Sequence, residues 1–196
     1  MSTIAAISTA PGIGGIGIIR MSGENCFEVL EKIFKQKNPQ NIEDIKGYTI
    51  KYGNIVENGE VVDEVLVSYF KAPKSYTTEN MCEINSHGGT VIIRKILELC
   101  LKNGADLAEP GEFTKRAFLN KKLDLSQAEA IADLIHSKTQ DFVLTSAKNL
   151  SGVLANKINT IKDDIFEILS RIVAGIDFPE DVNEPEYDYL IASMEN

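Results

Sequence analysis

Two charged side chains stand in segments whose patterns are otherwise typical of β-strands. Residues 15–21 (GIGIIRM) alternate as a strand does, and Arg20 therefore shares one face with two isoleucines. Glu83 lies in the middle of a second short apolar segment, residues 81–86 (MCEINS). An unpaired carboxylate is costly to bury. Glu83 therefore faces solvent, pairs with a nearby Arg or Lys, or accepts two parallel N–H bonds from a heterocycle, and the residues alone leave these alternatives open.

A glycine-rich segment precedes Arg20. Residues 12–17 (GIGGIG) fit the pattern G-x-G-x-x-G, which binds pyrophosphate where a helix N-terminus follows it. Here a β-branched, alternating segment follows, so Gly17 is predicted to enter a strand and a dinucleotide oxidoreductase is disfavoured. We interpret the segment as a flexible loop that lets backbone approach a ligand or partner. The sequence G-x-x-x-x-G-K-[ST] does not occur, so no P-loop for a nucleoside triphosphate is predicted.

The histidines and cysteines have mainly structural interpretations. His87 and His136 lie far apart, with no carboxylate at metal-ligand spacing, so no metal site is predicted. We expect His87, in His-Gly-Gly, to shape a loop and His136 to lie on a helix surface. Cys26, Cys82 and Cys100 form no C-x-x-C motif. Cys82 is predicted to be a small buried residue, and reduced, scattered thiols favour a cytosolic chain.

Length and composition are those of an ordinary globular protein. The chain has 196 residues, 43% hydrophobic and 25% charged, which fits one or two domains. No apolar run approaches the about 18 residues of a membrane span, and the N-terminus lacks an export-signal pattern. Of the net charge of −9, most comes from residues 180–196, which hold no Lys or Arg. The rest is nearly neutral, which argues against a self-sufficient nucleic-acid binder.

The elements that position these residues fall into two groups. The first group is predicted as strands at 3–8, 15–21, 48–52, 61–70 and 81–86, helices at 24–35 and from about 90 to 103, and a last strand at 105–108. Asn58-Gly59 predicts a tight hairpin turn, Ser22 is expected to cap the first helix, and Gly104 to end the second.

From residue 114 onward the pattern becomes helical. Thr114 is a candidate N-cap for a short helix to residue 120, and apolar or small residues between 147 and 172 recur in steps of three and four. That spacing predicts one packed helical seam running to about residue 176. The fold class predicted is α+β: an α/β domain at residues 1–118, then a long-helix arm at 119–179 and an acidic tail at 180–196.

Three blocks together are more specific than any single residue. Residues 10–23 (APGIGGIGIIRMSG), 83–89 (EINSHGG) and 110–135 (PGEFTKRAFLN, then KLDLSQAEAIADLI from Lys122) resemble the MnmE (TrmE) family of tRNA-modification GTPases. The resemblance continues to Phe178-Pro179. It implies an N-terminal domain similar to the folate-binding part of aminomethyltransferases, which forms a homodimer and binds a 5-formyl- or methylene-tetrahydrofolate. The family's folate contacts correspond to Arg20, Glu83 and Lys122, a binding set with no catalytic or metal residue.

The resemblance also implies the activity of a larger protein. With the flavoprotein MnmG (GidA), the family adds an aminomethyl-type group to the wobble uridine of tRNA in the cytoplasm. GTP, potassium and magnesium belong to a G domain that would follow the acidic tail, so this chain by itself is expected not to hydrolyse GTP. An alternative is a non-catalytic dimerisation scaffold with an incomplete folate pocket. A self-sufficient aminomethyltransferase is disfavoured because 196 residues omit a second substrate domain.

Overall fold

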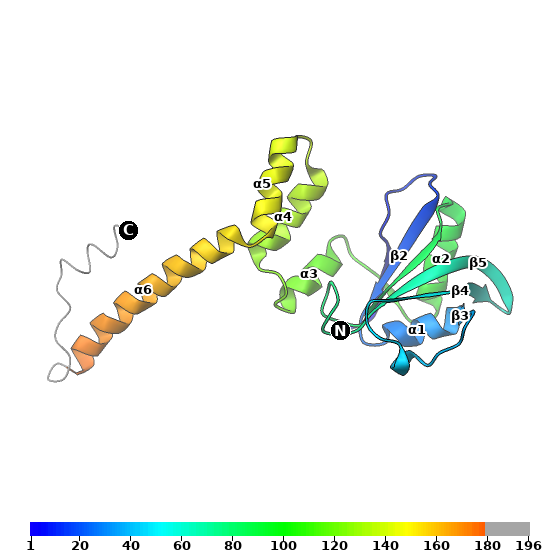
Figure 1. Cartoon of the computed structure of the whole chain (residues 1–196), viewed down its shortest axis with the longest axis horizontal. Helices are drawn as coiled ribbons and strands as arrows, with labels where there is room; N and C mark the ends of the chain where they lie inside the picture. Colours follow the sequence, from blue (N-terminus) through cyan, green and yellow to red (C-terminus); the bar gives the residue numbers. More distant parts are fainter. Residues whose placement is uncertain (179–196) are drawn as a thin grey trace. The chain divides into compact units, whose positions relative to one another are not determined.

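The computed structural model describes residues 1–178, and the predicted acidic tail at 180–196 lies outside the described residues. The chain divides into two compact units, Met1–Leu123 and a second that begins at Asp124. The first holds a mixed seven-stranded sheet with helices, and the second is helical (Figure 1). The predicted α+β class, with a helical arm after an α/β domain, is confirmed. No helix within residues 1–178 is long and apolar enough to cross a membrane.

The sheet brings segments together that are distant in the chain. Its strand order is β3-β4-β5-β6-β2-β1-β7, antiparallel throughout except for the β1–β7 pair. The strands are β1 (Ile4–Ile7), β2 (Ile16–Ser22), β3 (Phe34–Gln36), β4 (Thr49–Glu57), β5 (Glu60–Phe70), β6 (Met81–His87) and β7 (Asp106–Leu107). Because β6 lies between β5 and β2, the strand that holds Glu83 is the neighbour of the strand that holds Arg20.

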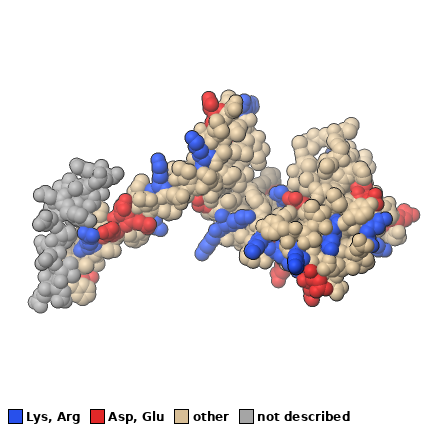
Figure 2. All heavy atoms as spheres, viewed as in Figure 1, with Lys and Arg blue, Asp and Glu red and all other residues tan. Residues whose placement is uncertain are grey.

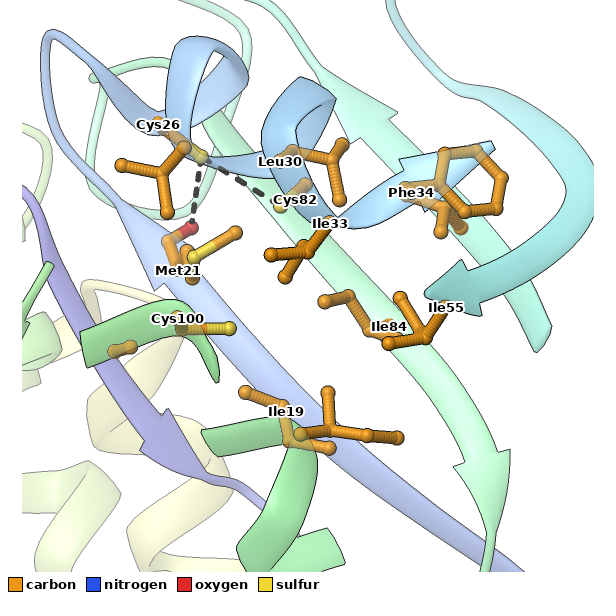
Figure 3. Close-up of a cluster of buried hydrophobic side chains, with 14 of the residues drawn as sticks. Ile19, Met21, Cys26, Leu30, Ile33, Phe34, Ile55, Cys82, Ile84 and Cys100 are labelled. Atoms are coloured by element: carbon orange, nitrogen blue, oxygen red, sulfur yellow. Dashed lines mark hydrogen bonds between the residues drawn. The ribbon is translucent and has the colours of Figure 1, made fainter. Parts of the chain in front are cut away.

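One face of the sheet carries the core of the first unit. The helices α1 (Cys26–Ile33) and α2 (Thr90–Lys102) pack against it. Ile19 and Ile84 from the strands and Leu30 and Ile33 of α1 all belong to this core (Figure 3). Since side chains alternate along β2, Arg20 points away from this core. The isoleucines that share its side lie on the open face of the sheet, as we call the face opposite α1 and α2, and Ile16 is 66% exposed there.

The turn between β4 and β5 follows the predicted hairpin. Asn58 and Gly59 have φ angles of 51° and 88°, the left-handed conformation that both central residues of this tight turn require. A register shift lies at Ile55/Val56. The hairpin prediction is confirmed, and both strands extend closer to the turn than predicted.

Two predicted helix caps are wrong. Ser22 is the last residue of β2, and α1 begins only after Asn25. Thr114 lies inside α3 (Glu112–Leu119), whose N-cap is Gly111 with a φ of 75°. Both hydroxyls bond to other segments instead: Ser22 to Thr77 and Thr114 to Tyr76. Tertiary partners have therefore replaced the local caps.

The second unit contains α4 (Leu125–His136), α5 (Gln140–Leu150) and α6 (Val153–Asp177). A capping box begins α4, in which the Asp124 carboxylate accepts from the Gln127 N–H while the Gln127 side chain accepts from the Asp124 N–H. The predicted continuous helical seam is wrong, because Gly152, at a φ of 84°, separates α5 from α6. A left-handed glycine ends helices in this way.

Candidate functional site

Arg20 and Glu83 are direct cross-strand neighbours on the open face. They are paired in the β2–β6 register, and Arg20 donates from Nε (2.9 Å) and Nη2 (2.7 Å) to the same oxygen, Oε1 of Glu83. Their side chains are 28% and 20% exposed. Of the alternatives that the sequence left open for Glu83, the structure shows pairing with an arginine. The second oxygen, Oε2, has no hydrogen-bond partner within residues 1–178.

Two aromatic rings flank the Arg20 guanidinium. We call residues 71–80, which join β5 to β6, the strap. Tyr76 of the strap has its ring centroid 5.5 Å from the Arg20 Cζ, and Phe113 of α3 has its centroid 5.6 Å from it. The Tyr76 hydroxyl hydrogen-bonds to the Thr114 hydroxyl at 2.8 Å, which ties the ring to α3. Aromatic faces attract cations at such distances. Sequence reasoning missed both rings.

Lys122, which follows α3 in the chain, also lies near the ring of Tyr76. Its Nζ donates to the Ser75 carbonyl at 2.6 Å and lies 5.7 Å from the Tyr76 ring centroid. A turn after α3, with Lys121 at a φ of 61°, directs the chain toward this position. The structure thus brings all the sequence-predicted site residues, Arg20, Glu83 and Lys122, to the surroundings of Tyr76.

Positive charge gathers near this part of the first unit. Figure 2 shows Lys and Arg side chains over α3 and the turn that follows it. That stretch contributes Lys115, Arg116, Lys121 and Lys122. Clustered charge of one sign raises the local concentration of oppositely charged ligands. Arg116 is already paired with Glu79 and Glu112, so the exposed lysines of this stretch are the groups that can attract an anionic part of a ligand.

Hydrogen bonds hold the exposed His87, and close packing accounts for two of the nearby glycines. His87 hydrogen-bonds through Nδ1 to Asp63 Oδ1 (2.7 Å), and its backbone N–H donates to Asp63 Oδ2 (2.9 Å). A Cβ on Gly88 would lie 2.2 Å from the Gly14 carbonyl oxygen, and one on Gly17 would lie 2.2 Å from a side-chain atom of the adjacent helix α2. Gly17 lies in β2 as predicted, so these glycines serve close backbone packing.

The thiols are buried in the core. Cys26 donates from Sγ to the Cys82 Sγ at 3.6 Å (Figure 3). This thiol contact and burial raise the pKa of Cys82 well above its usual range. Burial raises the pKa of Cys100 to about 12. The prediction that Cys82 is buried is confirmed. Within residues 1–178 no cluster of three or more His, Cys, Asp or Glu side chains could hold a metal ion.

Comparisons with known proteins agree with the two units. Residues 3–122 match the family model described as GTP-binding protein TrmE N-terminus, and residues 125–196 match the MnmE helical domain. The tRNA modification GTPase MnmE of Acetivibrio thermocellus is 52% identical over 185 residues, 93% of this chain and 40% of the relative. Its namesake in Thermoanaerobacter pseudethanolicus is 54% identical over 187 residues (94% and 41%), and that of Clostridioides difficile 51% over 189 (96% and 41%).

The chain thus spans about 40% of the length of these curated relatives. One family model covers more than half of the chain and the second covers most of the remainder. The chain belongs to the MnmE (TrmE) family.

Proposed function

We propose that this chain is the folate-binding, dimer-forming part of a tRNA-modification GTPase, and that Arg20, Glu83 and Lys122 hold a tetrahydrofolate derivative. The observation that carries the proposal is the meeting of these three side chains around Tyr76. Arg20 comes from β2 and Glu83 from the neighbouring β6. Lys122 follows the turn after α3, more than a hundred residues from Arg20. The 5-formyl and methylene forms are the proposed ligands.

The chemistry of a reduced pterin suits these groups. Its ring N–H and exocyclic amino group are adjacent donors, and a carboxylate oxygen accepts a hydrogen bond from such a group. Glu83 keeps Oε2 available while Arg20 fixes the other oxygen. Tyr76 and Phe113 offer faces for stacking the ring. Lys122 supplies a compact cation for a carbonyl or carboxylate of the ligand. These roles are binding roles, and none requires a proton transfer.

The proposal extends to a larger protein. We infer that the whole enzyme, with the flavoprotein MnmG, adds an aminomethyl-type group to the wobble uridine of cytoplasmic tRNA, the folate supplying the one-carbon unit. GTP hydrolysis, with potassium and magnesium, belongs outside residues 1–196. The names of the relatives as tRNA modification GTPases support this assignment.

Homodimer formation is supported by the open face of the sheet. Ile16, Ile50, Tyr52 and Leu66 are 66%, 62%, 46% and 46% exposed there, and exposed apolar groups of this kind mark association surfaces. This observation also supports the second candidate function, a dimerisation scaffold whose folate pocket is incomplete. Sedimentation with and without folate separates the two: a scaffold dimerises without binding folate.

The direct test is calorimetric titration with 5-formyltetrahydrofolate, after sedimentation has verified the dimer. Wild-type chain should bind saturably, and Glu83→Gln should bind about tenfold to a hundredfold more weakly because a charged acceptor is lost. Glu60→Gln, at the exposed end of β5, is the matched control and should bind as wild type does. A verified wild-type dimer without saturable binding would refute the proposal.

A second variant separates binding from folding. Arg20→Ala should lower folate affinity while the unit stays folded, because the guanidinium lies on the open face, away from the core. Circular dichroism provides the measure of folding. An unfolded variant would instead assign Arg20 a structural role.

A further inference from the structure

We propose that Arg116 is a positioning residue for the site, which holds the strap and α3 so that Tyr76, Phe113 and Lys122 meet Arg20. This inference rests on the proposed folate function. Arg116 itself is not placed in contact with ligand, since it acts through the segments that it joins.

Arg116 is a buried branch point between three segments. Its side chain is 5% exposed. Nη1 donates to the Ser2 carbonyl at 2.7 Å and to Glu79 Oε2 at 3.2 Å, and Nη2 donates to Glu112 Oε1 at 2.8 Å. One guanidinium therefore joins the N-terminal segment, the strap and the first turn of α3. Only a planar group with several fixed donors can make these bonds together, and a lysine ammonium cannot.

The network continues from Glu79 into the sheet. The Ser22 hydroxyl at the end of β2 donates to Glu79 Oε2 at 2.7 Å and hydrogen-bonds to the Thr77 hydroxyl at 2.6 Å. Asn120, just after α3, donates from Nδ2 to the Thr77 carbonyl at 2.7 Å. The strap is thus tied down immediately after Tyr76, on one side to β2 and on the other to the end of α3.

The site residues divide into two sets by what holds them. Arg20 and Glu83 stand on paired strands, and the β2–β6 ladder fixes them without Arg116. Tyr76 lies on the strap, and Phe113 and Lys122 lie on or just after α3. These two segments are the ones that Arg116 joins, so its loss should displace the second set and leave the first in place.

A double-mutant cycle tests this division, with the dissociation constant of 5-formyltetrahydrofolate as the readout. Arg116→Lys should weaken binding about tenfold in the wild-type background but only about threefold in a Tyr76→Ala background, because the part of its effect that passes through Tyr76 is already lost there and coupled residues are not additive. A residue that only stabilises the fold changes the melting temperature without such coupling in affinity. Equal weakening in both backgrounds, or unchanged affinity of Arg116→Lys, would overturn the inference.

Two further samples keep the result interpretable. Arg94→Lys, the same substitution at an exposed position of α2, is the matched control and should bind as wild type does. If Arg116→Lys does not fold by circular dichroism, Glu79→Gln takes its place in the cycle, since it removes the charge that Arg116 meets on the strap. Failure of the wild-type chain to bind folate refutes the proposed function, whereas normal wild-type binding with no coupling refutes only the role of Arg116.

Discussion

The two units of this chain bury their apolar side chains very differently. The sheet unit closes a core in which Ile19, Leu30 and Ile84 are fully buried. By contrast, α6 of the helical unit leaves Ile158 and Ile165 more than half exposed, along with several other apolar side chains. Hydrophobic burial is the main favourable term in folding. The sheet unit therefore has the means to fold independently, and the helical unit has far less.

This difference bears on where chemistry can be placed. A binding site needs side chains held by a rigid scaffold, and the three proposed folate contacts all belong to the unit with the closed core. The exposed apolar side chains of α6 are instead typical of a helix whose apolar face packs against other helices. The contrast predicts that the same kind of substitution, or the same denaturant, affects the stability of the two units to different extents.

The largest effect is expected for thiol labelling, since all the cysteines lie in the core of the sheet unit. In the native chain, labelling by Ellman's reagent should be at least about a thousandfold slower than in urea, because only unfolded chains expose these thiols. Helical circular dichroism should begin to fall at lower urea than the concentration at which thiols react. Native thiols that react as fast as free cysteine would show that the core is not closed.

The next largest effect is expected when an isoleucine is replaced by alanine in the sheet unit, compared with the same replacement in the helical unit. Ile84→Ala, in the sheet core, should lower the free energy of unfolding by about 3 kcal/mol, as cavity-forming substitutions do. Ile165→Ala, at a position 59% exposed on α6, should change it by no more than about 0.5 kcal/mol. Urea denaturation measures both. Equal losses would contradict the contrast between the units.

A smaller effect is expected at the start of α4. Asp124→Ala removes the capping box and should destabilise the helical unit by about 1 kcal/mol. Glu129→Ala, an exposed position inside the same helix, is the control and should change stability by only a few tenths of a kcal/mol. Thermal unfolding followed by circular dichroism reports both. The helical unit should respond to Asp124→Ala while the thiols of the sheet unit stay protected.

Acid should produce the smallest effect, through carboxylates in both units. The Ser126 hydroxyl and then backbone N–H groups lower the pKa of Asp124. Burial raises the pKa of Glu112, but bonds from the Glu109 N–H and Arg116 outweigh it and the pKa is lowered. A carboxyl with a lowered pKa in the folded state stabilises above its unfolded pKa and loses this as pH falls through the folded value. Stability should therefore fall below about pH 4, and less so in Asp124→Ala.

Local patterns were enough to predict much of the sheet unit. Alternation placed β2, a short apolar segment placed β6, and Asn-Gly placed the turn between β4 and β5. The insertion of β6 between β5 and β2 is a long-range feature, so no local pattern could pair Arg20 with Glu83. The resemblance to a family supplied that grouping instead.

The errors have physical causes of the same kind. Ser22 and Thr114 are good caps by type, yet each bonds to the strap instead, which no local rule anticipates. Tyr76 was missed because the strap has no periodic pattern, and Phe113 because it read as part of a turn before a helix. Only the break between α5 and α6 had a local signal, the glycine at position 152, which the periodicity of the surrounding apolar residues concealed.

The most direct test of the account is a crystal structure of the chain with 5-formyltetrahydrofolate bound. The account predicts the amino edge of the pteridine within hydrogen-bond distance of Glu83, the ring stacked against Tyr76 or Phe113, and the Lys122 ammonium on a ligand oxygen. A folate bound elsewhere, with Arg20, Glu83 and Lys122 all out of contact with it, would contradict the account.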